Sequence, residues 1–180
     1  MNRKLAHISH SSRSARIVSI LALLVCAALY SNAADTPVQV QLDTKEAKPR
    51  AVEALTEHGI LRDYRFAWDS MAQALERNSL DPLEGPFAGD AKEWLRETVL
   101  SQRHSGLSQR YAAQNHKLEA VFYAPEGDVM ELHDTAEYQL QFLDGGKVIG
   151  DQRIVQHFIV LMTPGADHWV IRQLQAVPQF

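Results

Sequence analysis

The chain has 180 residues, of which 46% are hydrophobic and 22% charged, and its formal net charge is −4. This length suffices for one domain and an accessory segment. The 18 basic residues are scattered, and several belong to the first 16 positions. A mildly acidic remainder without a basic stripe argues against nucleic acid as a partner.

The first 34 residues have the pattern of an export signal. Arg3, Lys4, Arg13 and Arg16 precede a run over 17 to 30 that is apolar except for Ser19, and small residues follow. This length is typical of a signal peptide and short for a membrane span of about 20 residues. The sequence predicts export across the cytoplasmic membrane. Residues 1–34 are then either a cleaved signal peptide, leaving a periplasmic or secreted protein, or an anchor through residues 17–34.

Cys26 is the only cysteine and lies inside this apolar run. Val25 precedes it, where a lipoprotein signal would have a small residue, which argues against lipidation. If the segment is cleaved, the mature chain has no disulfide, thiol nucleophile or thiolate metal site.

Residues 35–49 are polar and end at Pro49, which predicts a linker to a domain over 50–180. A short helix is expected over 50 to 59, with Gly59 as its stop. A second helix is expected over 60 to 78, with an amphipathic stripe formed by Leu61, Tyr64, Trp68, Met71 and Leu75.

A loop rich in proline and glycine is expected over 80 to 90, followed by a helix over 90 to 103. Asp90 is the candidate N-cap, with Glu93 at the capping-box spacing. The apolar stripe of this helix comprises Ala91, Trp94, Leu95, Thr98 and Val99.

From about residue 116 the apolar period changes from 3.6 to 2, which indicates strands. Four are expected, over 116 to 124, 129 to 143, 148 to 162 and 168 to 177, and Asp144-Gly145-Gly146-Lys147 is a hairpin signal. Sequential strands with short turns pair antiparallel. The fold class is therefore α+β, with N-terminal helices packed on an antiparallel sheet.

The hairpin around DGGK, the closing strand HWVIRQL and the Trp68 helix resemble the NTF2-like superfamily, to which the ketosteroid isomerases belong. The resemblance implies helices in the concave face of a curved, cone-shaped sheet over 50–180. The cavity of that cone holds a catalytic acid or base in some members and is filled with side chains in others. The loop at 80 to 90 resembles that of membrane-tethered, non-catalytic members, and exported members include assembly components of type IV secretion systems.

Asp134 is the single charge on the apolar face of its strand, among Leu132, Ala136 and Tyr138. Desolvation in a cavity could make this carboxyl group a general acid or base. The resemblance to steroid isomerases implies an aspartate base with a tyrosine donor, and Tyr64, Tyr111 and Tyr138 are the candidates. The alternative, which we favour, is that Asp134 pairs with an arginine or histidine of a neighbouring strand, or that a bulge turns it outward.

A hairpin centred on Gly145 and Gly146 places His157 opposite Asp134. The two could form a catalytic dyad, in which the carboxylate orients the imidazole. A buried pair that satisfies its own hydrogen bonds is the more common arrangement. His133 lies beside Glu131 and Glu137 on the polar face without a metal-binding motif, so neither a metal nor a cofactor is expected.

Structural roles are expected for the remaining histidines and for the tryptophans. His58, His104, His116 and His168 lie at expected element ends or in loops, where solvated surface or helix capping is the usual role. Three tryptophans are expected between helices and sheet: Trp68, Trp94 and Trp169.

Three functions follow from these features. The first is a non-catalytic binding or assembly domain that forms a homodimer or binds an envelope protein, and strand edges rich in glutamine suit this role: Gln139, Gln141, Gln173 and Gln175. The second is an enzyme that transfers a proton in a small apolar substrate, with Asp134 and His157 as catalytic candidates. The third is a carrier of a small apolar ligand, and the candidate ligand-binding residues are Tyr64, Trp68, Asp134, Tyr138 and His157.

Overall fold

A computed structural model describes residues 37 to 180. The predicted signal or anchor segment, with Cys26, lies outside the described residues. No helix in the described part is both long and apolar enough to cross a membrane. The elements in chain order are β1 (Gln39–Asp43), β2 (Lys48–Pro49), α2 (Ala54–Arg77), a 3-10 turn (Asp81–Leu83), α3 (Gly89–Ser105), β3 (Leu107–Tyr123), β4 (Met130–Asp144), β5 (Lys147–Pro164) and β6 (Trp169–Val177).

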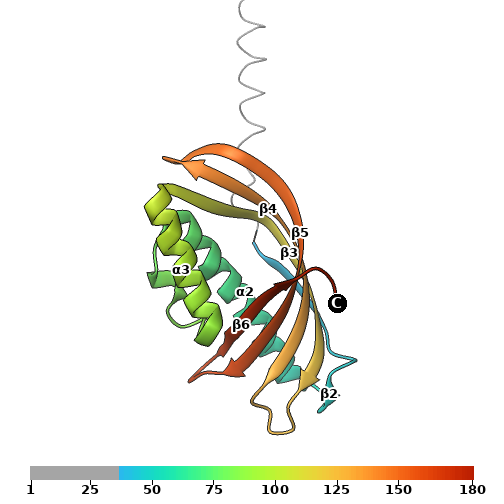
Figure 1. Ribbon diagram of the computed structural model, residues 1–180. Helices are drawn as coiled ribbons and strands as arrows, with labels where there is room; N and C mark the ends of the chain where they lie inside the picture. The colour runs from blue at the N-terminus through green and yellow to red at the C-terminus, as the bar shows by residue number, and fades with distance from the viewer. Residues whose placement is uncertain (1–36) are drawn as a thin grey trace, which may run out of the picture. The chain divides into compact units, whose positions relative to one another are not determined.

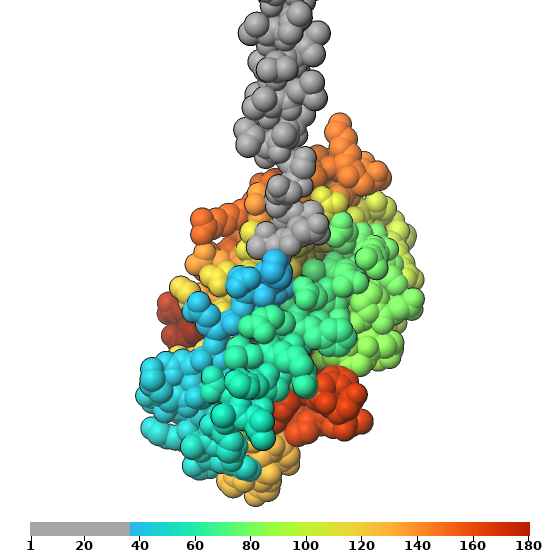
Figure 2. All heavy atoms as spheres, turned by 180° about the vertical axis from the view of Figure 1, so that it is seen from behind, coloured from blue at the N-terminus to red at the C-terminus, as the bar shows by residue number. Residues whose placement is uncertain are grey.

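The six strands form one sheet in the order β1-β3-β4-β5-β6, and β2 also pairs with β3. The pairs from β3 to β6 are antiparallel, whereas β1 and β2 run parallel to β3. The sheet bends strongly, and α2 and α3 lie against its inward face (Figure 1). From behind, these two helices lie side by side (Figure 2). The predicted α+β class is confirmed.

Helix α2 is one continuous helix, so the predicted stop at Gly59 is wrong. A Cβ built on Gly59 would lie 3.6 Å from Cδ1 of Trp169, which shows that this face of the helix packs closely on the start of β6. Such packing outweighs the low helix propensity of a single glycine. The predicted end is confirmed, because Asn78 adopts a left-handed conformation (φ 51°) and donates its amide N–H to the Ala74 carbonyl.

Helix α3 begins at Gly89 with Ala88 as N-cap, and no side chain caps it. The predicted capping box of Asp90 and Glu93 is therefore wrong, and Glu93 instead forms an ion pair with Arg96. Ala91, Leu95 and Val99 are buried as expected, whereas Trp94 is 45% exposed.

Two strand predictions need correction. β3 begins at Leu107, nine residues before the expected start, because Gly106 (φ 74°) ends α3 and turns the chain directly into the strand. β1 and β2 lie where a linker is expected, since β1 pairs with β3 in a register that places Gln39 opposite Asn115. The alternation of β4 is confirmed, with its even-numbered residues from 130 to 140 buried.

Candidate functional site

Asp134 lies in the middle of β4, in register with Leu118 of β3 and Phe158 of β5. Its side chain has no exposed surface. One carboxylate oxygen, Oδ2, accepts a hydrogen bond from the Tyr64 hydroxyl at 2.7 Å and lies 2.8 Å from Nδ1 of His116. Helix α2 supplies the tyrosine and β3 the histidine, so the cluster joins the helix layer to the sheet.

The predicted pairing of Asp134 with His157 is wrong by one residue. Next to the turn, Leu143 pairs with Val148 as a hairpin centred on the two glycines requires, but Phe142 then pairs with Gly150. The extra residue, Ile149, is a bulge, and a one-residue shift moves a side chain to the other face of a sheet. His157 consequently lies opposite Thr135 on the outward face, with its Nδ1 3.1 Å from the threonine hydroxyl.

A histidine of a neighbouring strand does lie at hydrogen-bond distance from Asp134, as the favoured alternative expects, but it is His116 of β3. The apolar period predicts this strand only from residue 116, nine residues too late, which places His116 at an element end. The signal was present in the alternation, since His116 has the same parity as the buried Leu118 and Ala120.

Aromatic rings fill the space around the carboxylate. The Trp68 ring centroid lies 4.2 Å from that of His116 and 5.6 Å from that of Phe158. The Tyr64 ring meets His116 edge-on at 5.7 Å. Tyr138 is 8% exposed and packs against Tyr111 with a centroid distance of 5.0 Å. The interior of this domain is therefore occupied by its own side chains at the position of Asp134.

The environment keeps the nearby phenols neutral. Burial, followed by the negative charge of Asp134, raises the pKa of Tyr64 well above its ordinary value. The same two causes raise the pKa of Tyr138. The Tyr64 hydroxyl is thus available as a hydrogen-bond donor, and it meets the carboxyl group of Asp134 and the ring of His116 without contact to solvent.

Three buried polar atoms of this cluster have no hydrogen-bond partner among the described residues. They are Nε1 of Trp68, Nε2 of His116 and Oδ1 of Asp134. Buried polar groups are normally bonded, and an unsatisfied one costs free energy. The cluster therefore has capacity for further hydrogen bonds that the surrounding protein does not use.

Of the residues predicted to bind a ligand, four belong to the inward face. Tyr64, Trp68, Asp134 and Tyr138 are all buried there. His157 is separated from them by the sheet, and its ring instead meets Phe180 at 5.0 Å. Phe180 also stacks on His133 at 4.2 Å. No group of three metal-binding side chains is found in residues 37 to 180.

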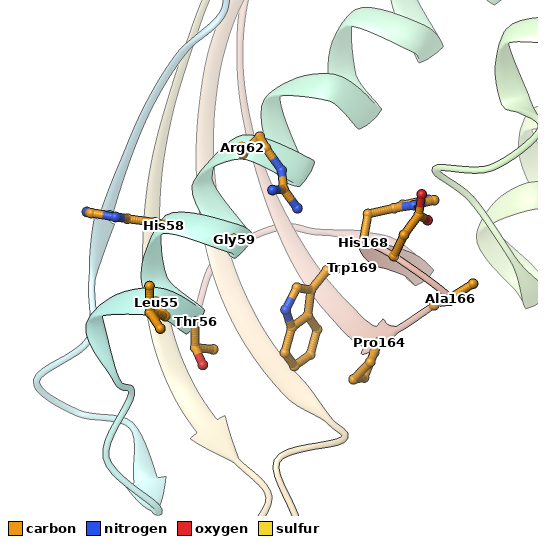
Figure 3. Close-up of a pocket in the computed structure, with 11 residues that line it drawn as sticks. Leu55, Thr56, His58, Gly59, Arg62, Pro164, Ala166, His168 and Trp169 are labelled. Carbon is orange, nitrogen blue, oxygen red and sulfur yellow. The ribbon is translucent and has the colours of Figure 1, made fainter.

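A separate surface groove of about 640 Å³ lies between the start of α2 and the β5–β6 turn. The Trp169 indole stands between helix and turn, whereas His58 points away (Figure 3). The charges in the groove are paired, Arg62 with the buried Asp63 at 2.7 Å and His168 with Asp167. The groove thus offers an apolar wall with neutralised charges, and its lining holds no cysteine or serine nucleophile.

Comparison with known proteins identifies the fold. No protein-family model matches the sequence, and no curated protein matches it. Among solved structures, the intermembrane space region of the chloroplast protein ARC6 is similar, with a TM-score of 0.56 and 12% identity. The match covers 72% of this chain and 98% of that chain. At this identity the likeness supports the α+β fold alone.

Proposed function

We propose that this chain is an exported NTF2-like domain with a non-catalytic binding or assembly role. The observation that carries the proposal is the sealed interior around Asp134. A general acid or base must come within hydrogen-bond distance of its substrate. Asp134 and His116 are fully buried and Tyr64 is 0% exposed, so their functional groups serve one another and the packing of α2 on the sheet.

The outward face of the sheet is the proposed binding surface. The outward face of an antiparallel sheet is normally polar when water covers it. Here it carries Val155 (57% exposed), Phe180 (52%) and Phe122 (39%). Exposed apolar groups that gather on one face commonly mark an interaction site. We propose a second copy of the chain or an envelope protein as the partner.

Export is the second part of the proposal. It rests on the basic and apolar pattern of residues 1 to 34. The fold similarity to a domain from an intermembrane space fits a location outside the cytoplasm. Contact with a membrane is proposed only through the N-terminal segment.

Native mass spectrometry of the exported chain tests the binding role. We expect a dimer or a complex with an envelope protein, and we expect Val155→Glu to dissociate it because a charge would be buried at the interface. Leu55→Glu is the matched control, since Leu55 is 86% exposed on α2. A monomer without any partner would contradict the proposal. A retained small apolar molecule would favour the carrier or enzyme function instead.

A further inference from the structure

The outer edge of β6 is only partly covered. β6 is the last strand in the sheet order, and a short segment before α3 runs beside its first half. Phe87 forms a parallel bridge with Ile171. Ile171 donates its amide N–H to the Pro86 carbonyl, and its own carbonyl accepts from Ala88, both at 3.0 Å. This edge therefore already binds one extended stretch of chain.

The covering segment leaves the edge at a defined residue. Gly89 adopts φ +54°, and a Cβ there would approach the Arg172 carbonyl oxygen at 3.3 Å. The chain turns at this point into α3. Beyond it, residues 173 to 176 have no main-chain partner on their outer side within the described chain. The bulge at Arg172 shifts the alternation by one residue, so the outward amides after Ile171 are those of Leu174 and Ala176.

An apolar groove of about 380 Å³ adjoins this open edge. Trp94 of α3, 45% exposed, forms one wall, and Phe158 of β5 belongs to the lining. Leu174 and Ala176 of β6 line the other side. Unpaired edges are usually protected by charges or proline, but residues 173 to 176 are Gln-Leu-Gln-Ala. A free row of amides and carbonyls beside an apolar groove is the arrangement used for strand addition.

We propose that this edge and groove bind an extended segment of another protein as an added strand next to β6. Main-chain hydrogen bonds to Leu174 and Ala176 would fix the register of the added strand relative to β6. An apolar side chain of the segment would fill the groove against Trp94. The single charged residue of the lining is Asp90, which favours a segment with one basic residue at that end. This inference rests on the proposed binding role and names its partner class, but it uses a surface other than the outward sheet face.

Fluorescence anisotropy with the exported chain tests the inference. The probe is a labelled hexapeptide, acetyl-Lys-Val-Thr-Val-Thr-Val-amide, and its comparator carries N-methyl groups on alternate amides. We expect saturable binding of the probe below about 1 mM, weakened at least about tenfold by N-methylation. Trp94→Ala should weaken it by a similar factor, and Asp90→Asn by about threefold. Val155→Glu, on the outward face, should leave it unchanged.

Several results would overturn the inference. They are absence of saturable binding, equal binding of the N-methylated peptide, and full affinity in Trp94→Ala.

Ala176→Pro removes an outward amide at an edge, where proline is tolerated. If Ala176→Pro dissociates a dimer and the peptide does not bind to the chain, the edge of β6 pairs with a second copy of this chain rather than with a segment of another protein. Loss of the dimer in Val155→Glu with intact peptide binding would separate the two surfaces, and a monomeric chain that binds the probe would refute only the outward-face partner.

Discussion

The two faces of the sheet hold histidines in opposite environments. On the inward face, His116 is fully buried, lies 2.8 Å from the Asp134 carboxylate and packs against Trp68. On the outward face, His157 is half-buried, lies 3.1 Å from the Thr135 hydroxyl and touches the half-exposed Phe180. Asp134 and Thr135 are adjacent residues of β4. Two adjacent residues of one strand thus belong to a buried polar cluster around Asp134 and to a partly exposed one around Thr135.

The two faces are therefore expected to respond differently to substitution. A carboxylate in a low-dielectric interior depends on every partner, because it cannot exchange a lost hydrogen bond for water. The same groups on the outward face can be hydrated when a partner is removed. Substitutions should therefore change stability mainly on the inward face and association mainly on the outward face.

The largest effect is expected from removing the buried carboxyl group of Asp134. Asp134→Ala should lower the free energy of unfolding by about 3–5 kcal/mol. The substitution leaves Tyr64 and His116 buried without their hydrogen-bond partner, and it leaves a cavity. Urea denaturation monitored by tryptophan fluorescence measures it. His157→Ala is the outward control and should cost less than about 1 kcal/mol. Equal losses in both variants would remove the distinction between the faces.

Tyr64→Phe tests a single hydrogen bond of the inward cluster. It should lower the free energy of unfolding by about 1–3 kcal/mol, because Oδ2 of Asp134 loses its phenol donor. Tyr138→Phe is a matched control, since Tyr138 is buried nearby and its hydroxyl forms no hydrogen bond with a side chain or main chain of residues 37 to 180. It should cost less than the Tyr64 substitution. A double-mutant cycle with Asp134→Ala, which removes the acceptor, should show coupling, and strict additivity would argue that the bond is weak.

Phe180→Ala should perturb only the outward face. Loss of a half-exposed aromatic contact costs about 0.5–1 kcal/mol, less than either inward substitution. In a histidine NMR spectrum, we expect the ring signals of His133 and His157 to move because Phe180 contacts both rings. The His116 signals should stay in place. Movement of His116 instead would mean that the two faces communicate through the sheet.

His168 should give the smallest effect, and one that depends on pH. The hydrogen bond to the Gly85 carbonyl, then the bond to Asp167, raise the pKa of His168 above its ordinary 6.5. A raised pKa adds stability that is complete below about pH 6.5 and is lost as pH rises through the folded-state value. Solvent near this side chain should keep the effect below about 1 kcal/mol. Melting curves of the wild type and His168→Gln should converge as pH rises, and parallel curves would refute the linkage.

Patterns with a strong period could be predicted from the sequence. The alternation around Asp134 correctly predicted β4 and its apolar inward face, because one face of the strand must lie on a core. The stripe through Tyr64 and Trp68 correctly placed both side chains inside. These features depend on local spacing alone.

Features that depend on tertiary contacts could not be predicted. The bulge at Ile149 moved His157 to the outward face, and no local signal marks that residue as extra. The partner His116 was missed because Gly106 joins α3 to β3 without a loop. Strand β1 looks like a polar linker, because Val40 is its only buried residue and its partner strand lies far along the chain.

The parallel pairing of β1 with β3 has a consequence for the order of events during folding. β1 comes before both helices in the sequence, and its hydrogen-bond partner, β3, comes after them. The hairpin of β4 and β5 needs only neighbouring residues, whereas β1 must wait for a long loop to close. β1 is therefore expected to join the sheet late, and its backbone stays without its partner strand until β3 has been made.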